Sequence, residues 1–140
     1  MFKLLAPDAP PGNVSANATG SKAIKVKWSP VPYEQRNGII RGYEVKYYLI
    51  DEELLWLYHI GNDWNAEDSE LLNLWKFTNY TINDGNAEDV ELFNLSKFTN
   101  YIICVLAFTI DQNGNKLKSN CSGTVSERTL EDGKFMHQSK

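Results

Sequence analysis

Leu95-Ser-Lys-Phe-Thr-Asn-Tyr101-Ile-Ile-Cys-Val-Leu-Ala107 predicts a turn that leads into a buried strand. After the turn, every second residue suits the interior of a protein: Tyr101, Ile103, Val105 and Ala107. A tyrosine at such a corner can bury its ring while its hydroxyl bonds to backbone a few residues upstream. The pattern predicts a two-sheet antiparallel sandwich, and it favours a binding or spacing module over an enzyme.

Two earlier segments alternate in the same way. Residues 23–28 place Ile24, Val26 and Trp28 on one face, and residues 42–49 do so with Tyr43, Val45, Tyr47 and Leu49. Prolines and an Asn37-Gly38 pair lie between these segments and predict turns. Residues 123–129 predict a short final strand. We therefore expect a core that includes Trp28, Tyr43, Val45, Leu95, Tyr101, Ile103 and Val105.

Five pieces of the chain, in this order, resemble a fibronectin type III domain: residues 6–14, 28–32, 37–47, 95–107 and 129–132. The resemblance implies an all-β, immunoglobulin-like sandwich of seven antiparallel strands. Strands A, B and E would form one sheet, and strands C, C′, F and G the other. The amino-acid sequences of these five segments resemble those of modules in cell-adhesion molecules and receptor-type tyrosine phosphatases.

The length of 140 residues suits one domain. We expect an N-terminal extension over residues 1–5, the domain over residues 6–132, and a tail or linker over residues 133–140. The net charge of −4 argues against nucleic acid as a partner. No run is long and apolar enough for a membrane span. Residues 1–6 are too short for the apolar region of a signal peptide, so we expect an excised or a soluble intracellular module.

A tandem duplication separates this chain from the family pattern. Residues 65–80 recur as residues 86–101, and only three of the 16 pairs differ: Ser69/Val90, Leu72/Phe93 and Trp75/Ser96. The repeated unit covers strand E and the tyrosine corner. We expect the surplus to be an inserted segment over about residues 62–85, of natural or engineered origin.

Only one copy can occupy the strand E position, and the sequence favours the second. Tyr101 runs directly into the alternating strand, whereas Tyr80 is followed by turn residues up to Gly85. Val90 also suits a strand better than Ser69 does. The first copy would then form an extra edge strand, a helical or irregular excursion, or a disordered loop. It either packs along the sandwich without a binding role or contacts another chain, for which domain swapping is one route.

Four aromatic residues are candidate partner contacts. Trp75 and Phe77 lie in the first copy, while Trp56 and Trp64 lie near the expected C′ strand and the loop after it. Tryptophan is enriched at binding hot spots. The alternative is that Trp56 packs on the C′ face and that Trp64 covers a loop.

The two cysteines leave two readings open. Cys104 lies on the strand face opposite Tyr101, and Cys121 precedes the last strand. A hairpin turn centred between Gln112 and Asn113 would bring the cysteines opposite each other and allow a disulfide. A turn centred on Asn113 and Gly114 would leave them diagonal. The alternative to a disulfide is a pair of unrelated free thiols. The pair has no metal-site spacing, and both histidines are distant in sequence.

Sequons for N-glycosylation occur at Asn13, Asn17, Asn79, Asn94 and Asn120. Such triplets are modified only in the secretory route and on accessible surface. We expect Asn94 to be partly shielded because it adjoins the buried Leu95. Together with the cysteine pair, the sequons favour an extracellular or cell-surface setting as part of a larger protein.

The sequence offers no catalytic constellation. It has no phosphate-binding loop, nucleophile elbow or HExxH motif, and its acidic clusters lie in hydrophilic turns. We expect no enzyme activity and no cofactor. The expected partners are other proteins, with self-association through the duplicated segment as one form. The alternatives are an intracellular structural module like those of giant muscle proteins, an accessory module of a larger enzyme, or an engineered strand duplication.

Overall fold

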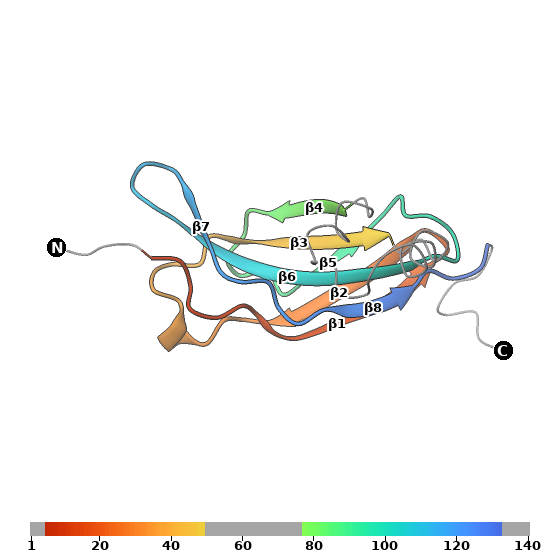
Figure 1. Cartoon of the computed structure of the whole chain (residues 1–140), viewed down its shortest axis with the longest axis horizontal. Coiled ribbons are helices and arrows are strands. Elements are labelled where there is room, and N and C mark those ends of the chain that lie inside the picture. The colour runs from red at the N-terminus through yellow and green to blue at the C-terminus, as the bar shows by residue number, and fades with distance from the viewer. Residues whose placement is uncertain (1–4, 50–76, 133–140) are drawn as a thin grey trace, which may run out of the picture.

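The computed structural model describes residues 5–49 and 77–132, which form two layered antiparallel sheets (Figure 1). The three-stranded sheet has the order β1-β2-β5, from Gly12–Gly20, Ala23–Ser29 and Asp89–Leu92. The five-stranded sheet has the order β4-β3-β6-β7, with β8 also paired to β6; these strands are Phe77–Ile82, Gly42–Leu49, Asn100–Ile110, Lys116–Lys118 and Val125–Arg128. A short 3-10 helix, η1, spans Tyr33–Gln35. The predicted two-sheet sandwich is confirmed.

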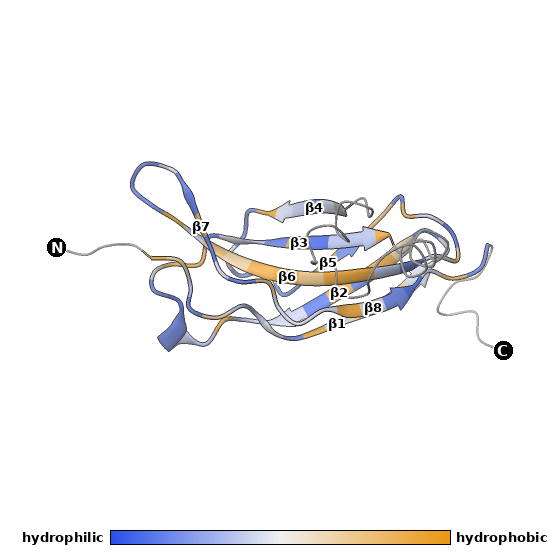
Figure 2. Cartoon of the chain, in the orientation of Figure 1, coloured by the Kyte–Doolittle hydropathy of each residue, from blue (hydrophilic) through white to orange (hydrophobic). Residues whose placement is uncertain are grey.

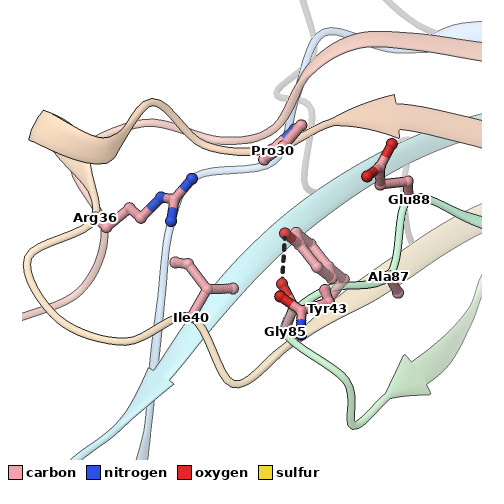
Figure 3. Close-up of a pocket in the computed structure, with 8 residues that line it drawn as sticks. Pro30, Arg36, Ile40, Tyr43, Gly85, Ala87 and Glu88 are labelled. Carbon is pink, nitrogen blue, oxygen red and sulfur yellow. Dashed lines mark hydrogen bonds between the residues drawn. The ribbon is translucent and has the colours of Figure 1, made fainter.

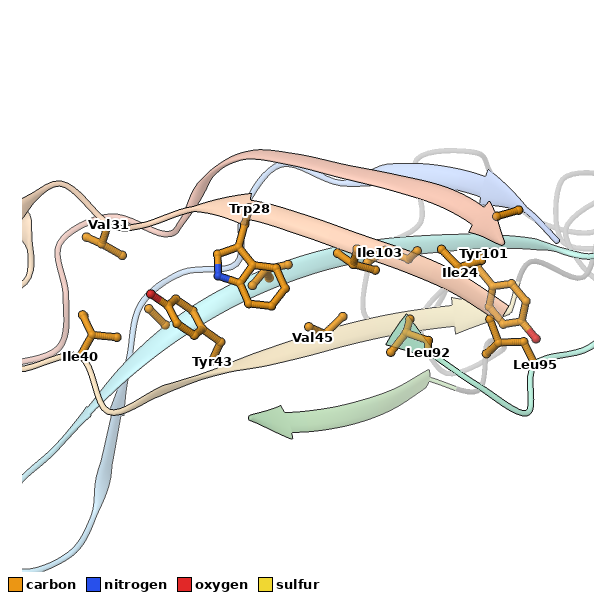
Figure 4. Packing of buried hydrophobic residues seen from close by; sticks show 14 residues of the cluster. Ile24, Trp28, Val31, Ile40, Tyr43, Val45, Leu92, Leu95, Tyr101 and Ile103 are labelled. Carbon is orange, nitrogen blue, oxygen red and sulfur yellow. The ribbon is translucent and has the colours of Figure 1, made fainter. Parts of the chain in front are cut away.

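The core lies between the two sheets. The alternation read from the sequence is followed in β2, where Ile24, Val26 and Trp28 are buried and Lys27 is exposed. In the facing sheet, Val45 pairs with Val105 of β6 and both are fully buried. Figure 2 shows the apolar run along β6, and Figure 4 shows the side chains meeting between the layers. All seven residues expected in the core are buried: Trp28, Tyr43, Val45, Leu95, Tyr101, Ile103 and Val105.

The tyrosine corner has the geometry that its sequence suggests. The Tyr101 ring is buried, and its hydroxyl accepts a 2.8 Å hydrogen bond from the backbone N–H of Ser96. The N–H of Leu95 donates to the carbonyl of Lys22 at 3.0 Å, which ties the corner to the three-stranded sheet. The corner therefore fixes where β6 begins and joins the two layers at one end of the sandwich.

The second copy of the duplicated segment occupies the strand E position, as the sequence indicates. Strand β5 pairs with β2 through Ile24 opposite Leu92 and Val26 opposite Val90. Leu92 is fully buried, and Val90 packs against the core. Val90 faces this apolar environment at the position where the first copy has a serine, which explains why the second copy suits the slot better.

The end of the first copy forms an edge strand. Strand β4 pairs antiparallel with β3, with Tyr80 opposite Val45 and Ile82 opposite Tyr43, so it takes the C′ position. The sequence placed the C′ strand near Trp56 and read the residues after Tyr80 as a turn, and both expectations are corrected here. The strand continues because Ile82 packs against the core, and the turn begins only after it. Trp56, Trp64 and Trp75 lie outside the described residues.

Candidate interaction surface

Two loops meet at one end of the sandwich, and we call this end the loop pole. It consists of the β2–β3 loop, residues 30–41, and the β4–β5 loop, residues 83–88. A Cβ atom at Gly85 would collide with the backbone carbonyl of Ile40, so only glycine permits the two loops to approach this closely. The β4–β5 loop is therefore held against the β2–β3 loop by its backbone.

Two buried aromatic residues anchor the β4–β5 loop to the core. The Tyr43 hydroxyl donates to the carbonyl of Gly85 at 3.3 Å, and the Trp28 indole N–H donates to the carbonyl of Ala87 at 3.0 Å. The two rings contact each other at 5.2 Å between centroids. Burial raises the pKa of Tyr43, and the nearby positive charge of Arg36 offsets only part of this rise, so the pKa lies above its ordinary value. The hydroxyl is therefore protonated and can donate at neutral pH.

A hollow opens between the loops, above Tyr43 (Figure 3). It has a volume of about 150 Å³ and is lined by Pro30, Arg36, Ile40, Tyr43, Gly85, Asn86, Ala87 and Glu88. A wider, shallower hollow of about 600 Å³ shares Arg36, Ile40, Gly85 and Asn86 with it and reaches Tyr33 and Ile39. The two hollows together present polar and apolar surface, with the cationic Arg36 and the anionic Glu34 and Glu88 among their lining side chains.

Large apolar side chains stand exposed beside these hollows. Tyr33 is 83% exposed and Ile39 is 71% exposed, so both side chains present apolar surface to solvent. Exposed apolar surface of this kind can mark a site of interaction. The Arg36 guanidinium lies 5.7 Å from the centre of the Tyr33 ring, and its Nε–H donates to the carbonyl of Val31 at 2.7 Å. Tyrosine and arginine are among the residue types that are enriched at the binding hot spots of protein interfaces.

The N-terminal segment braces the loop pole. The N–H of Asp8 donates to the carbonyl of Gln35 at 2.7 Å, and the Asn37 side-chain amide donates to the carbonyl of Ala6 at 3.1 Å. The N–H of Arg41 donates to the carbonyl of Phe108 at the end of β6. These bonds order the loop before any partner arrives, which lowers the entropy cost of binding.

Sequence reasoning missed this surface. It treated residues 30–41 as a turn-rich connection and placed the candidate contacts in the duplicated segment and at Trp56 and Trp64 instead. One signal was present, because Ile39 and Ile40 are adjacent and only one of two neighbours can point inward. Of the four aromatic residues named as partner contacts, only Phe77 lies within the described residues, where it begins β4.

The two cysteines are joined in the structure. The sulfur atoms of Cys104 and Cys121 are bonded, with 5.8 Å between their Cα atoms and a sequence separation of 17. A disulfide that closes a loop of this size restricts the unfolded chain, and this raises the free energy of unfolding by about 3 kcal/mol. Neither of the two hairpin registers considered from the sequence applies, because β6 pairs with β7 in a register centred on Asn113, and the pairing then shifts by two residues before β8.

A buried carboxylate fastens β7 to the five-stranded sheet near this disulfide. Glu44 of β3 is almost fully buried, and its oxygens lie 3.3 Å from the Lys116 ammonium and 3.1 Å from the Lys118 ammonium. Burial by itself raises the pKa of Glu44, but the nearby ammonium groups of Lys118 and Lys116 outweigh it, so the pKa lies below its ordinary value. The pair of lysines thus keeps this carboxylate ionised.

All five sequon asparagines are exposed: Asn13, Asn17, Asn79, Asn94 and Asn120. The expected shielding of Asn94 is therefore wrong. Its backbone adopts a left-handed conformation with φ of 60°, which directs the chain so that Asn94 is exposed while the next residue, Leu95, is buried. Asparagine tolerates this conformation better than most residues do.

Within residues 5–49 and 77–132, no group of three or more histidine, cysteine or acidic side chains could hold a metal ion. In the same part of the chain, no helix has the length and apolar character needed to cross a membrane.

The model of the fibronectin type III domain family matches residues 9–122, so the chain belongs to this family. Domains of this class are generally non-catalytic modules. Among solved structures, the third fibronectin III domain of the human KIAA0343 protein covers 96% of this chain and 91% of its own length, with a TM-score of 0.62 and 20% identity. The chicken CNTN1 FN1–FN3 structure covers 90% of this chain and 33% of its own length, with a TM-score of 0.60 and 20% identity. At this identity, the likeness shows the fold alone.

Curated relatives give a more specific likeness over part of the chain. The cell adhesion molecule DSCAM of Gallus gallus is 43% identical over 79 residues, and the receptor-type tyrosine-protein phosphatase F of Mus musculus is 40% identical over 78 residues. Protein sidekick-2 of Mus musculus is 37% identical over 79 residues. Each match covers 54% of this chain and 4% of the relative's length. The chain is thus similar to single modules of adhesion and receptor proteins.

Proposed function

We propose that this chain is a non-catalytic extracellular module of an adhesion or receptor protein, which spaces neighbouring domains and binds another protein at its loop pole. The observation that carries the proposal is a preorganised surface that exposes Tyr33 and Ile39 beside a hollow floored by the buried Tyr43. The likeness to adhesion and receptor modules supports the general role. The bonded cysteines and the exposed sequons support the extracellular setting.

The chemistry of the loop pole suits a protein partner with an apolar side chain at the centre of its contact. Burial of Tyr33 and Ile39 would supply the hydrophobic contribution, at about 25 cal/mol for each Å² removed from water. Arg36 and Glu88 at the rim would fix the orientation of polar groups on the partner. Because the loops are already held by backbone hydrogen bonds, little of this energy would be lost in ordering them.

The extracellular setting is tested by the mass of the intact chain. The chain, expressed behind a secretion signal in eukaryotic cells, should carry glycan mass and should resist alkylation of Cys104 and Cys121 without reductant. A bare chain with two alkylated thiols would contradict the extracellular proposal and would make an intracellular structural module the better reading.

The loop pole is tested by binding of a fluorescent tetramer of the chain to a panel of cultured cells. We expect binding that is lost after mild protease treatment of the cells and in a Tyr33→Ala/Ile39→Ala variant. Both side chains are exposed, so this variant should keep its melting temperature. Phe93→Ala is the matched control, because Phe93 is 64% exposed in the β5–β6 connection at the other end of the sandwich (Figure 1). Equal loss in both variants, or in neither, would contradict the assignment of the surface.

A further inference from the structure

The last strand carries a bulge opposite β6. Phe108 of β6 pairs with Lys118 of β7, and Ile103 of β6 pairs with Val125 of β8. Between these two pairs, the last strand has two more residues than β6 has. The extra length lets the chain leave the regular ladder around Asn120.

Two serine hydroxyls hold the base of this bulge. The Ser119 Oγ accepts a 3.0 Å hydrogen bond from the N–H of Ala107, and the Ser122 Oγ accepts a 2.9 Å hydrogen bond from the N–H of Val105. Each hydroxyl also donates to a backbone carbonyl, of Asn120 and of Gly123 respectively. Both serines are buried. Each hydroxyl therefore both accepts and donates a hydrogen bond within the folded chain.

The same bulge is an N-glycosylation sequon, Asn120-Cys121-Ser122. Its three residues have different surroundings, because Asn120 is exposed, Cys121 is bonded to Cys104, and Ser122 is buried. The glycosyl transfer needs the hydroxyl of the third residue as well as the asparagine amide, which is why the acceptor motif is defined by both. The folded chain offers the amide and withholds the hydroxyl.

We propose that Asn120 is N-glycosylated only before the Cys104–Cys121 disulfide closes the last strand onto β6, so that thiol oxidation sets the fraction of chains that carry this glycan. The inference rests on the proposed extracellular function, because both reactions belong to the secretory route. A glycan attached early does not prevent later closure, since the Asn120 side chain lies outside the strand ladder and is exposed. The bulge accommodates the modified and the unmodified chain alike.

The two competing steps balance separately. In glycosylation, the Asn120 amide nitrogen loses a proton and forms a bond to the anomeric carbon of a lipid-linked oligosaccharide, and the bond from that carbon to the diphosphate breaks. In closure, the Cys104 and Cys121 thiols lose two protons and two electrons to a disulfide-bearing oxidoreductase, which is reduced to a dithiol. Closure removes the Ser122 hydroxyl from reach without any change at Asn120.

Asn94 provides an internal control. Its sequon, Asn94-Leu95-Ser96, has an exposed asparagine and an exposed serine and contains no cysteine. It also lies in the β5–β6 connection, away from the bulge. Slow folding in general would raise the occupancy of both sequons, whereas delayed closure of the disulfide would raise that of Asn120 alone.

The test is the site occupancy of the whole chain secreted from eukaryotic cells, measured on peptides by mass spectrometry. We expect partial occupancy of Asn120 in the unchanged chain, and a rise toward full occupancy in a Cys104→Ser variant with Asn94 unchanged. Because this variant loses the disulfide and risks misfolding, a second arm keeps the unchanged chain and adds a brief pulse of dithiothreitol during synthesis. The same rise at Asn120 is expected there.

Four outcomes would overturn one or the other of the two proposals. If Asn120 is fully occupied in the unchanged chain, or insensitive in both arms while Asn94 carries glycan, then closure does not control it. If Asn94 rises in parallel with Asn120, the effect is one of folding in general. If no sequon carries glycan and both cysteines react with alkylating reagent, the extracellular function itself fails, which separates the two proposals.

Discussion

The tetrapeptide Phe-Thr-Asn-Tyr occurs twice in the chain and has a different structure in each place. Residues 77–80 are extended throughout, as part of β4. In residues 98–101, Phe98 belongs to a turn, Thr99 follows it, and only the last two residues enter β6. Tyr80 is 46% exposed at the edge of a sheet, while Tyr101 is buried in the tyrosine corner. Local sequence therefore permits both structures and selects neither.

Neighbours from elsewhere in the chain make the difference. The N–H of Phe98 donates to the carbonyl of Leu130, and the N–H of Thr99 donates to the Thr129 hydroxyl, so the segment after β8 holds the second tetrapeptide in its turn. The first tetrapeptide lies along β3 instead, with Thr78 opposite Tyr47. Hydrogen bonds to distant backbone outweigh the weak local preference of these four residues.

The largest expected difference in stability between the two copies comes from replacing Tyr101 or Tyr80 by alanine. Tyr101→Ala removes a buried ring and should lower the free energy of unfolding by about 3–5 kcal/mol. Tyr80→Ala removes a ring that is nearly half exposed on an edge strand, and should cost about 1 kcal/mol. Chemical denaturation of both variants measures the contrast. Equal costs would mean that the two copies share the corner position.

A smaller effect isolates the hydroxyl groups. Tyr101→Phe leaves the Ser96 N–H without its partner and should cost about 1–2 kcal/mol. Tyr80→Phe should stay within about 0.5 kcal/mol of the unchanged chain, because the residue is exposed. Thermal unfolding is sensitive enough to separate the two. A neutral Tyr101→Phe would remove the corner hydrogen bond as a source of stability.

Replacement by glycine should change stability differently at Phe98 and at Phe77, the first residues of the two tetrapeptides. Phe98 has a φ of 45°, a conformation that costs an L-residue about 1–2 kcal/mol and glycine almost nothing. Phe98→Gly loses the ring contact with the Arg128 guanidinium at 4.6 Å, so we expect a net change within about 0.5 kcal/mol of zero. Phe77→Gly places glycine in a strand and should cost about 1 kcal/mol. Similar losses at both positions would contradict the strain at Phe98.

The smallest effect concerns Tyr47. It belongs to β3, which lies between the strands that carry Tyr80 and Tyr101. Burial raises the pKa of Tyr47, a hydrogen bond from Thr78 opposes this, and Tyr101 and Tyr80 raise it further. The folded state therefore holds this proton more tightly than the unfolded state does. The associated stability is intact below about pH 10, the ordinary pKa of tyrosine, and is lost as pH rises through the raised folded pKa.

Unfolding measured between neutral and strongly alkaline pH tests this expectation. Tyr47→Phe should show a shallower loss of stability with rising pH than the unchanged chain. Phe93→Ala is the control, because it removes an exposed side chain that does not ionise. Parallel slopes for the chain and its Tyr47→Phe variant would show that Tyr47 does not contribute.

Much of the fold could be predicted because its signals are local in sequence. Alternation in residues 23–28 and 42–49 marks the strands, and the two faces of each are decided by neighbouring residues alone. The interaction surface could not be predicted, since it arises where Gly85 of one loop meets Ile40 of another. The adjacent Ile39 and Ile40 signal that one of these side chains is exposed, but they do not indicate which other loop packs against them.

The sequence by itself determined the sandwich, the tyrosine corner and the choice of the second copy for strand E, because each depends on a buried face that periodicity reveals. Tertiary structure alone decided that residues 77–82 form the C′ strand and that Phe98 turns where Phe77 extends. It also decided that the last strand bulges to bring Cys121 to Cys104. The physical reason is that edge pairing, turn closure and register shifts depend on backbone hydrogen bonds between segments far apart in sequence, which carry no periodic signal of their own.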